Sequence, residues 1–312
     1  MNKIIVTTTI YSVSDALKKF LTFNDWNLII VGDKKTPHEE YIELDKKYIN
    51  VKYLTPEYQE KNFKEISDLI GWNTIQRRNI GFLQALKDGA EIIASVDDDN
   101  IPLDNWGQNL LIGKETDVYY YETDEIAFDP IGVTNYKHLW HRGFPIQNLN
   151  QRNNYKITRK TIIPDIQADF WNGDPDIDAV CRLEHKPMCF FDDKFFPLST
   201  NTFSPFNSQN TFFSRESLKK YMVIPFIGRM DDIWGGYYLE SLGFKVVYNR
   251  ATVFQDRNIQ NLTNNMVNEF IGYEKTKNLL YVLKKNSENF KDFLSENSKQ
   301  FMNKYLLITK DL

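Results

Sequence analysis

Cysteine, histidine and an excess of either charge are scarce in this sequence. Its 312 residues include only 2 cysteines, Cys181 and Cys189, which exclude a disulfide framework and lack histidine partners at zinc-ligand spacing. The formal net charge of −4 gives no basic field of the kind that binds nucleic acid. We therefore expect no nucleic-acid partner and a cytoplasmic chain in a reducing compartment.

Long apolar runs are missing as well. No window comes near the roughly 18 consecutive apolar residues that a membrane-spanning helix needs. The first residues, MNKIIVTTTIYSVSD, contain an apolar run that is too short and too rich in threonine for a secretion signal. We expect no membrane span, and a peripheral membrane contact through the C-terminal tail stays open.

The composition is that of a folded globular protein, with 42% hydrophobic and 14% aromatic residues. Four short apolar runs in the first hundred residues predict strands that are buried on both faces of a parallel sheet, namely 4–6, 28–31, 51–54 and 92–96. Helical spacing over 13–23 and 58–70 separates them. This alternation predicts a doubly wound α/β fold.

The most clearly marked helix is expected over residues 74–88. Asn73 and Gln76 predict an N-cap with a capping box, and Gly89 stands where a glycine ends a helix. One apolar face, made of Ile75, Phe82, Leu83 and Leu86, is expected to point to the sheet.

The pattern along the chain predicts three parts. Residues 1–104 form the first half of the α/β domain, and 105–258 form a loop-rich second half with strands at 117–121 and 244–248. Residues 259–312 form a C-terminal helical extension. Its buried candidates are Met266, Phe270, Leu280, Leu283, Phe290, Phe293, Leu294, Phe301, Met302 and Leu306.

Acidic residues follow two of the predicted strands. Asp33 follows the second strand, and Asp97, Asp98 and Asp99 follow the fourth. Ligands of open α/β sheets bind outside the carboxyl ends of the strands. Carboxylates at i and i+2 suit Mg²⁺ or Mn²⁺, and such a cation would stabilise a departing diphosphate. The alternative for the triplet is a solvated acidic turn.

An Arg-Asn helix, a glycine, a strand and then an Asp-x-Asp resemble the nucleotide-sugar half of GT-A glycosyltransferases. Four further segments follow in the order of one group: LWHRGFPIQNL (139–149), DPDIDAVCRLE (174–184), PFNSQNTFFSRE (205–216) and IGRMDDIWGGYYLE (227–240). Together they resemble the reversibly glycosylated polypeptides, or UDP-arabinopyranose mutases, and their STELLO-like relatives. The resemblance covers about residues 1 to 250 and implies a GT-A-like fold.

The resemblance also implies a donor site. Asp97 and Asp99 are expected to hold Mn²⁺ or Mg²⁺. The expected contacts to the nucleotide of a donor, with UDP as the expected nucleotide, are Thr8, Asp33, Arg77, Arg78, Asp97 and Asp98. One of the two arginines could reach a phosphate or hold an acidic residue, whereas the other belongs to an exposed helix face.

Asp231 and Asp232 are the expected catalytic pair. They stand just before an apolar run, as acids do at a helix N-terminus, and a plain capping pair is the alternative. The resemblance implies that an acid here is the general base. We choose Asp232 for that role and Asp231 for binding or orienting the acceptor. A base must reach the acceptor hydroxyl, and the neighbouring carboxylate of Asp231 would raise the pKa of Asp232.

Sugar or acceptor contacts are expected from polar and aromatic residues of the second half, namely Arg142, Trp171, Asp176, Asp178, Asn207 and Gln209. Arg142 matches the position that the resemblance implies is self-glycosylated, but His141 before it departs from the pattern. The alternative for Arg142 is an exposed arginine on the surface. The alternatives are a solvated turn for Asp176 and Asp178, and an Asx-rich turn for Asn207 and Gln209. His185 is the leading histidine for a metal ligand.

The sequence therefore predicts a metal-dependent glycosyltransferase that moves a sugar from a nucleoside-diphosphate sugar to the hydroxyl of a glycan or small molecule. The first alternative is a UDP-sugar mutase, which needs the same donor site but no external acceptor. The second is a scaffold that binds glycans or nucleotides without turnover.

Overall fold

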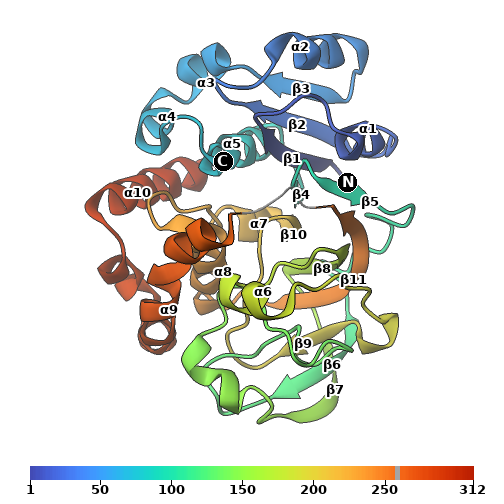
Figure 1. The fold of residues 1–312 in the computed structure, drawn as a ribbon. Helices are drawn as coiled ribbons and strands as arrows, with labels where there is room; N and C mark the ends of the chain where they lie inside the picture. Colours follow the sequence, from blue (N-terminus) through green and yellow to red (C-terminus); the bar gives the residue numbers. More distant parts are fainter. Residues whose placement is uncertain (257–260) are drawn as a thin grey trace.

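The computed structural model describes residues 1–256 and 261–312. One large mixed sheet runs through the molecule in the order β3-β2-β1-β4-β10-β8-β11-β9-β6-β7, and β5 pairs with β11 (Figure 1). Its strands are β1 (Lys3–Thr9), β2 (Asn27–Gly32), β3 (Val51–Leu54), β4 (Ile92–Val96), β5 (Asn100–Pro102), β6 (Thr116–Glu122), β7 (Lys156–Ile162), β8 (Ile166–Gly173), β9 (Leu198–Thr200), β10 (Asn210–Ser214) and β11 (Val246–Gln255).

The first half of the sheet is parallel, as predicted. β1 lies between β2 and β4, and β2 pairs with β3. The apolar runs place buried side chains on both faces of these strands, as the pattern of β4 shows with all five residues buried. The predicted α/β class, with a sheet that is parallel in this half, is confirmed. Because these strands are parallel, the residues after β1, β2 and β4 meet at one edge of the sheet.

In the first half the helices follow the predicted order with one addition, and the second half contains two short helices that the sequence did not predict. The α-helices are α1 (Asp15–Phe20), α2 (His38–Lys47), α3 (Pro56–Asn62), α4 (Lys64–Ile70), α5 (Arg78–Lys87), α6 (Ala179–His185), α7 (Arg215–Leu218), α8 (Asp231–Ser241), α9 (Leu262–Lys285) and α10 (Glu296–Lys310). The 3-10 helices are η1 (Ile75–Arg77), η2 (Ile146–Gln151), η3 (Asp193–Phe195), η4 (Gly228–Met230) and η5 (Ser287–Phe293). The sequence did not predict α2, and 58–70 is two helices that meet at Phe63.

The predicted capping box before α5 is wrong. Asn73 has a left-handed backbone with φ of 58°, and α5 begins only at Arg78 after the short η1. Ile75 is 43% exposed, so it does not belong to the apolar face, whereas Phe82, Leu83 and Leu86 are buried. The C-terminal prediction is confirmed, because Gly89 has φ of 76° and follows the C-cap residue Asp88.

The second half contains the predicted strands at β6 and β11, and four that the sequence did not predict, namely β7, β8, β9 and β10. β10 is antiparallel to both of its neighbours, β4 and β8, and so joins the two halves of the sheet. It begins at Asn210, inside the polar stretch for which we predicted sugar contacts, with an Asx-rich turn as the alternative. The polar residues just before β10 are therefore held beside the end of β4.

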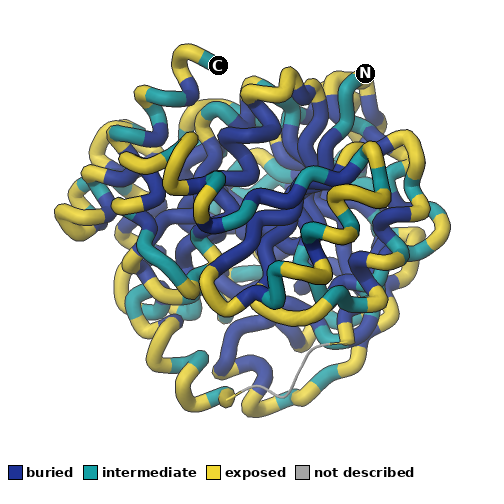
Figure 2. The backbone as a smooth tube through the Cα atoms, turned by 90° about the horizontal axis from the view of Figure 1, so that it is seen from above, coloured by how far each residue is buried: buried dark blue, intermediate teal, exposed yellow. Residues whose placement is uncertain are grey.

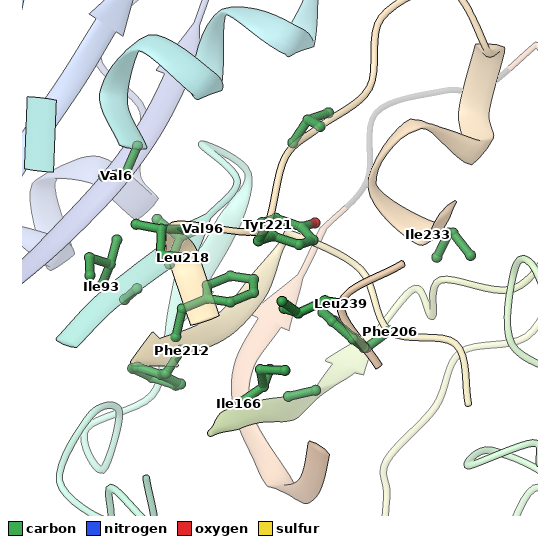
Figure 3. Close-up of a cluster of buried hydrophobic side chains, with 14 of the residues drawn as sticks. Val6, Ile93, Val96, Ile166, Phe206, Phe212, Leu218, Tyr221, Ile233 and Leu239 are labelled. Atoms are coloured by element: carbon green, nitrogen blue, oxygen red, sulfur yellow. The ribbon is translucent and has the colours of Figure 1, made fainter. Parts of the chain in front are cut away.

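The core follows the centre of the sheet, and exposed residues lie on the outside (Figure 2). Figure 3 shows side chains of β1, β4, β8 and β10 gathered with residues of α7, α8 and the segment between them, such as Leu218, Tyr221 and Leu239. The rings of Phe213 and Tyr221 stack with their centroids 4.4 Å apart. Both cysteines are buried and free.

The C-terminal helices fasten the two halves together. α10 packs on α4 of the first half, and α9 packs on α6 and α8 of the second (Figure 1). Most of the predicted core positions in this region are buried or partly buried. Phe270 is wrong because its side chain is 64% exposed, and Met266 is only partly covered. Within residues 1–256 and 261–312, no helix combines the length and apolar character needed to cross a membrane.

Two glycines let α8 approach its neighbours closely. A Cβ atom on Gly235 would lie 2.1 Å from the backbone oxygen of Met222, and one on Gly236 would lie 2.9 Å from the ring of Phe206. We expect Gly235→Ala to lower the free energy of unfolding by about 2 kcal/mol, because backbone atoms must move. Denaturant unfolding measures the change.

Gly272→Ala is the matched control for Gly235→Ala. Its Cβ would meet the side chain of Met230, with the sulfur at 2.4 Å, rather than backbone. Because a methionine side chain can turn away, we expect a smaller loss of stability. Equal losses in the two variants would contradict the close backbone approach of α8.

Candidate active site

Arg78 offsets the crowding of the three aspartates after β4. Its guanidinium, which is 1% exposed, donates from Nη2 to Oδ1 of Asp97 over 2.5 Å. Burial, the largest single effect, lowers the pKa of Arg78, but the charge of Asp97, the hydrogen bond to it and the charges of Tyr221 and Asp232 together raise the pKa above its usual value. Arg78 therefore stays charged. Arg78 therefore holds Asp97 in place, and the alternative of a solvated acidic turn does not apply to Asp97.

Asp98 is held from the ends of β1 and α1. The hydroxyl of Thr9 donates to its Oδ2, and that of Ser14 donates to its backbone oxygen over 2.5 Å. Ser14 is also the N-cap of α1, accepting from the amide of Leu17. Burial raises the pKa of Asp98, helped by the charge of Asp97. A cation nearby would favour its ionised form.

A cavity of ≈ 380 Å³ opens beside these residues. Its lining contains four aspartates and no lysine or arginine, and consists of Tyr11, Ser14, Asp15, Ala16, Asp98, Asp99, Ile101 and Asp256. Oxygen ligands without a competing cation fit Mg²⁺ or Mn²⁺, which are commonly bound by one or two carboxylates together with substrate phosphates. The cavity fits a cation that is bound jointly by protein carboxylates and substrate phosphates. Within the described part of the chain, no three acidic, histidine or cysteine groups form a metal cluster of their own.

The structure changes which aspartates face this cavity. Asp98 and Asp99 line it, whereas Asp97 does not and is paired with Arg78. Of the predicted metal pair, Asp99 lines the cavity and Asp97 does not, whereas Asp98 does. The prediction of Asp97 and Asp99 as metal ligands stays a prediction, and the structure shows that the carboxylate of Asp97 is engaged by Arg78.

Asp232 lies at the start of α8 and is saturated with donors. It accepts from Nη1 and Nη2 of Arg142 over 3.0 and 3.2 Å, and from the amide and hydroxyl of Ser208 over 3.0 and 3.2 Å. Burial, the largest single effect, raises the pKa of Asp232, but the charge of Arg142 and the hydrogen bonds from Arg142 and the amide of Ser208 together hold the pKa below its usual value. A carboxylate held in this way is a weak proton acceptor.

Asp231 has the opposite environment. Its Oδ2 accepts from Nε2 of Gln76 over 2.6 Å, and its Oδ1 accepts from the amide of Asp232 over 3.0 Å. Burial, and then the charge of Asp232, raises the pKa of Asp231 to about 7. A general base works best with a pKa near the operating pH. The roles that we predicted for the pair stay predictions, and the environment of Asp231 suits a general base better than that of Asp232 does.

Arg142 is committed to the protein rather than to a ligand. Its five N–H groups all meet acceptors, from Nε and Nη2 to Asp176, from Nη1 and Nη2 to Asp232, and from Nη1 to the backbone oxygen of Arg229. The side chain is buried, so the alternative of a surface arginine is also wrong. Arg142 and Asp176, which we predicted as sugar contacts, instead hold Asp232 in place.

The two acidic motifs belong to one network. Arg78 donates to the backbone oxygen and the hydroxyl of Ser208 over 2.9 and 2.8 Å, and that hydroxyl donates to Asp232. Asn207 donates to Asp176 over 2.8 Å, and the backbone oxygen of Gln209 accepts from the amide of Asp97 over 3.2 Å. Asn207 and Gln209 are buried, so they connect the network rather than present their amides to a sugar.

Three residues that we predicted as nucleotide contacts, Asp33, Thr8 and Arg77, are bonded or buried within the protein. Asp33 is 1% exposed and accepts from the amides of Asn73 and Thr74 over 2.7 and 3.0 Å, which orders the loop before α5. The hydroxyl of Thr8 donates to the backbone oxygen of Val31 over 3.0 Å. Arg77 is fully buried, so neither arginine lies on an exposed helix face.

Arg77 joins α3, α4 and α5. It donates to Oε1 of Gln59 and to the hydroxyl of Ser67, and its guanidinium stacks 3.7 Å from the ring centroid of Trp72. Burial lowers its pKa to about 10. Arg77→Ala leaves these buried acceptors unpaired, and we expect it to cost about 3 kcal/mol of stability in thermal unfolding. Arg159→Ala is the control, since Arg159 stacks on Tyr119 at 3.5 Å but is exposed.

The remaining predicted contacts also have internal partners. Asp178 is the N-cap of α6 and accepts from the amide of Cys181 over 2.8 Å. Trp171 is buried in β8, edge-to-face with His141 at 5.7 Å between ring centroids. His185 ends α6 with Glu184 at 3.4 Å and has no metal cluster around it within the described residues. These residues are not arranged around the acidic cavity.

Sequence reasoning missed several residues of the site. Thr9, Ser14, Gln76 and Asp256 each contact or accompany the acidic groups. Ser14 before Asp15 is a recognisable N-cap signal, and it would have placed a helix start beside the triplet. Gln76 and Asp256 carry no such signal, because tertiary structure alone brings them to their partners.

No family model matches the chain. Two curated plant proteins do: "Probable glycosyltransferase STELLO1" of Arabidopsis thaliana is 23% identical over 270 residues, 78% of this chain and 34% of that protein. "Probable glycosyltransferase STELLO2" of the same plant is 23% identical over 271 residues, 79% of this chain and 35% of that protein. The chain thus spans about a third of the length of these relatives.

Solved structures are similar only at a low level. A197 from STIV has a TM-score of 0.36 and 13% identity, covering 83% of this chain and 87% of its own. The mannosyltransferase PcManGT from Pyrobaculum calidifontis, in complex with GDP-Man and Mn²⁺, has a TM-score of 0.44 and 8% identity, covering 99% and 73%. Scores below 0.5 identify no function. In its sequence, the chain is distantly similar to these two proteins, which are named as probable glycosyltransferases.

Proposed function

We propose that the protein is a metal-dependent glycosyltransferase that moves a sugar from a nucleoside-diphosphate sugar to an acceptor hydroxyl. The single observation that supports this most is the network from Asp97 through Arg78 and Ser208 to Asp232. It fixes an acidic cavity and a carboxyl of raised pKa, Asp231, in one site. The distant STELLO homologues bear the name of the same reaction class.

The donor is proposed to bind at the cavity beside Asp98 and Asp99. Mn²⁺ or Mg²⁺ held by these carboxylates would neutralise the diphosphate and stabilise its departure. Ser14 and the N-terminus of α1 border the same cavity. UDP is the first nucleotide to test, since the group that the sequence resembles uses UDP-sugars.

Arg78 is proposed as a positioning residue rather than a phosphate ligand. Its Nη1 and Nη2 atoms serve Ser208 and Asp97, and its side chain is buried behind the triplet. From there it fixes the first aspartate and leaves the next two to face the cavity. It also donates to Ser208, which in turn donates to Asp232 at the N-terminus of α8.

Asp231 is proposed as the general base. Its carboxylate takes the proton of the acceptor hydroxyl while that oxygen bonds to the anomeric carbon and the bond to the diphosphate breaks. Arg142 keeps Asp232 charged, Asp176 holds Arg142 in place, and the fixed charge of Asp232 contributes to the raised pKa of Asp231. Gln76 orients the base by donating to it.

The test is release of UDP from UDP-sugars by the purified protein with Mn²⁺, with and without a panel of glycan and small-molecule acceptors. We expect slow release that rises when a suitable acceptor is added, and loss of release in Asp99→Asn. Asp68→Asn, at an exposed ion pair on α4, should behave as the wild type. Equal release by Asp99→Asn and the wild type would contradict the donor site.

A further inference from the structure

A polar groove lies at the edge of the sheet opposite the acidic cavity. A cavity of ≈ 670 Å³ is lined by the end of β6, by β9, by the start of β11 and by the last turns of α8 and α9. A second cavity of ≈ 510 Å³ shares Thr123, Asp124, Lys160 and Asn201 with it. Because they share walls, the two cavities form one extended depression, here called the β9 groove.

The β9 groove is separate from the candidate active site. Glu240 lines the groove at the C-terminal end of α8, whereas Asp231 begins that helix. At 1.5 Å per residue they are about 14 Å apart along the helix axis. β11 likewise enters the groove at Val246 and ends at Gln255, beside the residues that follow Asp99.

Glu240 gives the groove a carboxyl group whose oxygens can accept further hydrogen bonds. The hydrogen bonds that it accepts, within the described residues, come from the amide of Ser204 over 3.1 and 3.3 Å. Two carboxylate oxygens can accept about four hydrogen bonds. Burial raises the pKa of Glu240 well above its usual value, and no cation nearby opposes it. Such a group is suited to pairs of hydroxyls rather than to a metal.

The rest of the lining is rich in small polar groups. Hydroxyl and amide side chains dominate it, among them Thr200, Asn201, Thr202 and Ser241, and aromatic surface comes from Phe244 and, in the second cavity, Tyr155. Lys245 and Lys284 are exposed at the rim and form no ion pair in the described part of the chain, whereas Lys160 pairs with Glu122 at 2.6 Å. The rim therefore offers two uncommitted cations.

We propose that the β9 groove binds an extended anionic oligosaccharide. Glu240 would hold hydroxyls of one sugar ring, Phe244 would lie against its apolar face, and Lys245 and Lys284 would meet carboxylates or phosphates on the chain. The volumes of the two joined cavities, ≈ 670 and ≈ 510 Å³, leave room for more than one sugar ring. This site works independently of donor binding.

The experiment uses a printed array of uronate-containing, phosphorylated and neutral oligosaccharides, probed with the purified protein in EDTA so that no metal-dependent donor site contributes. We expect binding to anionic members of several units. The affinity of the best array member, measured by titration, should weaken at least about tenfold in Glu240→Gln, because an NH2 group replaces one of the two oxygens that accept from hydroxyls. It should also weaken in Lys245→Ala with Lys284→Ala, because charge-assisted hydrogen bonds are lost. The arms with uronates and with phosphates identify which anion is bound.

Lys46→Ala, an exposed lysine on α2, is the matched control and should bind as the wild type does. Melting temperatures show that each variant is folded. Binding that survives unchanged in both groove variants lies elsewhere and overturns the proposal, as does an array on which no anionic oligosaccharide binds. Binding of neutral members alone would also overturn it.

Discussion

Asp231→Asn should lower kcat by about 10²–10⁴-fold, the usual contribution of a general base, while donor binding stays unchanged. The asparagine keeps the shape of the side chain, and its single amide oxygen can still accept from the amide of Asp232, whereas its NH2 group replaces the oxygen that accepts from Gln76. The melting temperature of the variant shows that it is folded, so that the loss of kcat reports proton transfer. Steady-state UDP release gives kcat, and calorimetric titration with a UDP-sugar gives donor affinity.

The pH profile provides a second reading of the same group. Burial and the charge of Asp232 raise the pKa of Asp231 to about 7, so the fraction of unprotonated base grows as pH rises through about 7. We expect wild-type kcat to rise across that range and to level off above it. An asparagine variant that keeps both its rate and this rising limb would remove Asp231 from the role of base.

Arg142→Ala should have the largest effect on stability, a loss of about 3–5 kcal/mol in the free energy of unfolding. It leaves two buried carboxylates, Asp176 and Asp232, without their shared counter-charge. Urea unfolding followed by circular dichroism measures the change. Arg250→Ala is the control, because Arg250 is 40% exposed and its pair with Asp193 at 3.6 Å is worth less than about 1 kcal/mol.

The same variant tests the position of Arg142 against a ligand role. If Arg142 were a free ligand of sugar or phosphate, its removal would weaken substrate binding and leave stability nearly unchanged. The structure predicts the reverse order, because all five N–H groups are bound by protein acceptors. A stable Arg142→Ala protein with a raised KM alone would contradict this assignment.

Local pattern was sufficient for the first half of the fold. Runs such as Ile92 to Val96 specify buried parallel strands, and Gly89 specifies a helix end, because each depends on neighbours in sequence. The capping box failed for a tertiary reason: Asp33, 40 residues away, binds the amide of Asn73 and fixes its left-handed backbone. β10 was hidden for a similar reason, because its polar first residues are satisfied inside the sheet.

The site was predicted in part. The two acidic motifs are in one network, but the roles within each motif depend on buried arginines whose direction a sequence does not give. Arg78 takes Asp97 away from the cavity, and Arg142 takes Asp232 away from proton transfer. Sequence spacing identified the chemical groups, and only the packing decides which carboxylate of each motif is left for a ligand.

The central claim is that Asp98 and Asp99 bind a divalent cation together with a nucleoside diphosphate. Calorimetric titration of UDP into the protein, with Mn²⁺ and with EDTA, tests it most directly. We predict that Mn²⁺ tightens binding at least about tenfold in the wild type. The double variant Asp98→Asn with Asp99→Asn should lose this gain while it stays folded. Binding of UDP that is equal with Mn²⁺ and with EDTA, or a gain that the double variant retains, would contradict the claim.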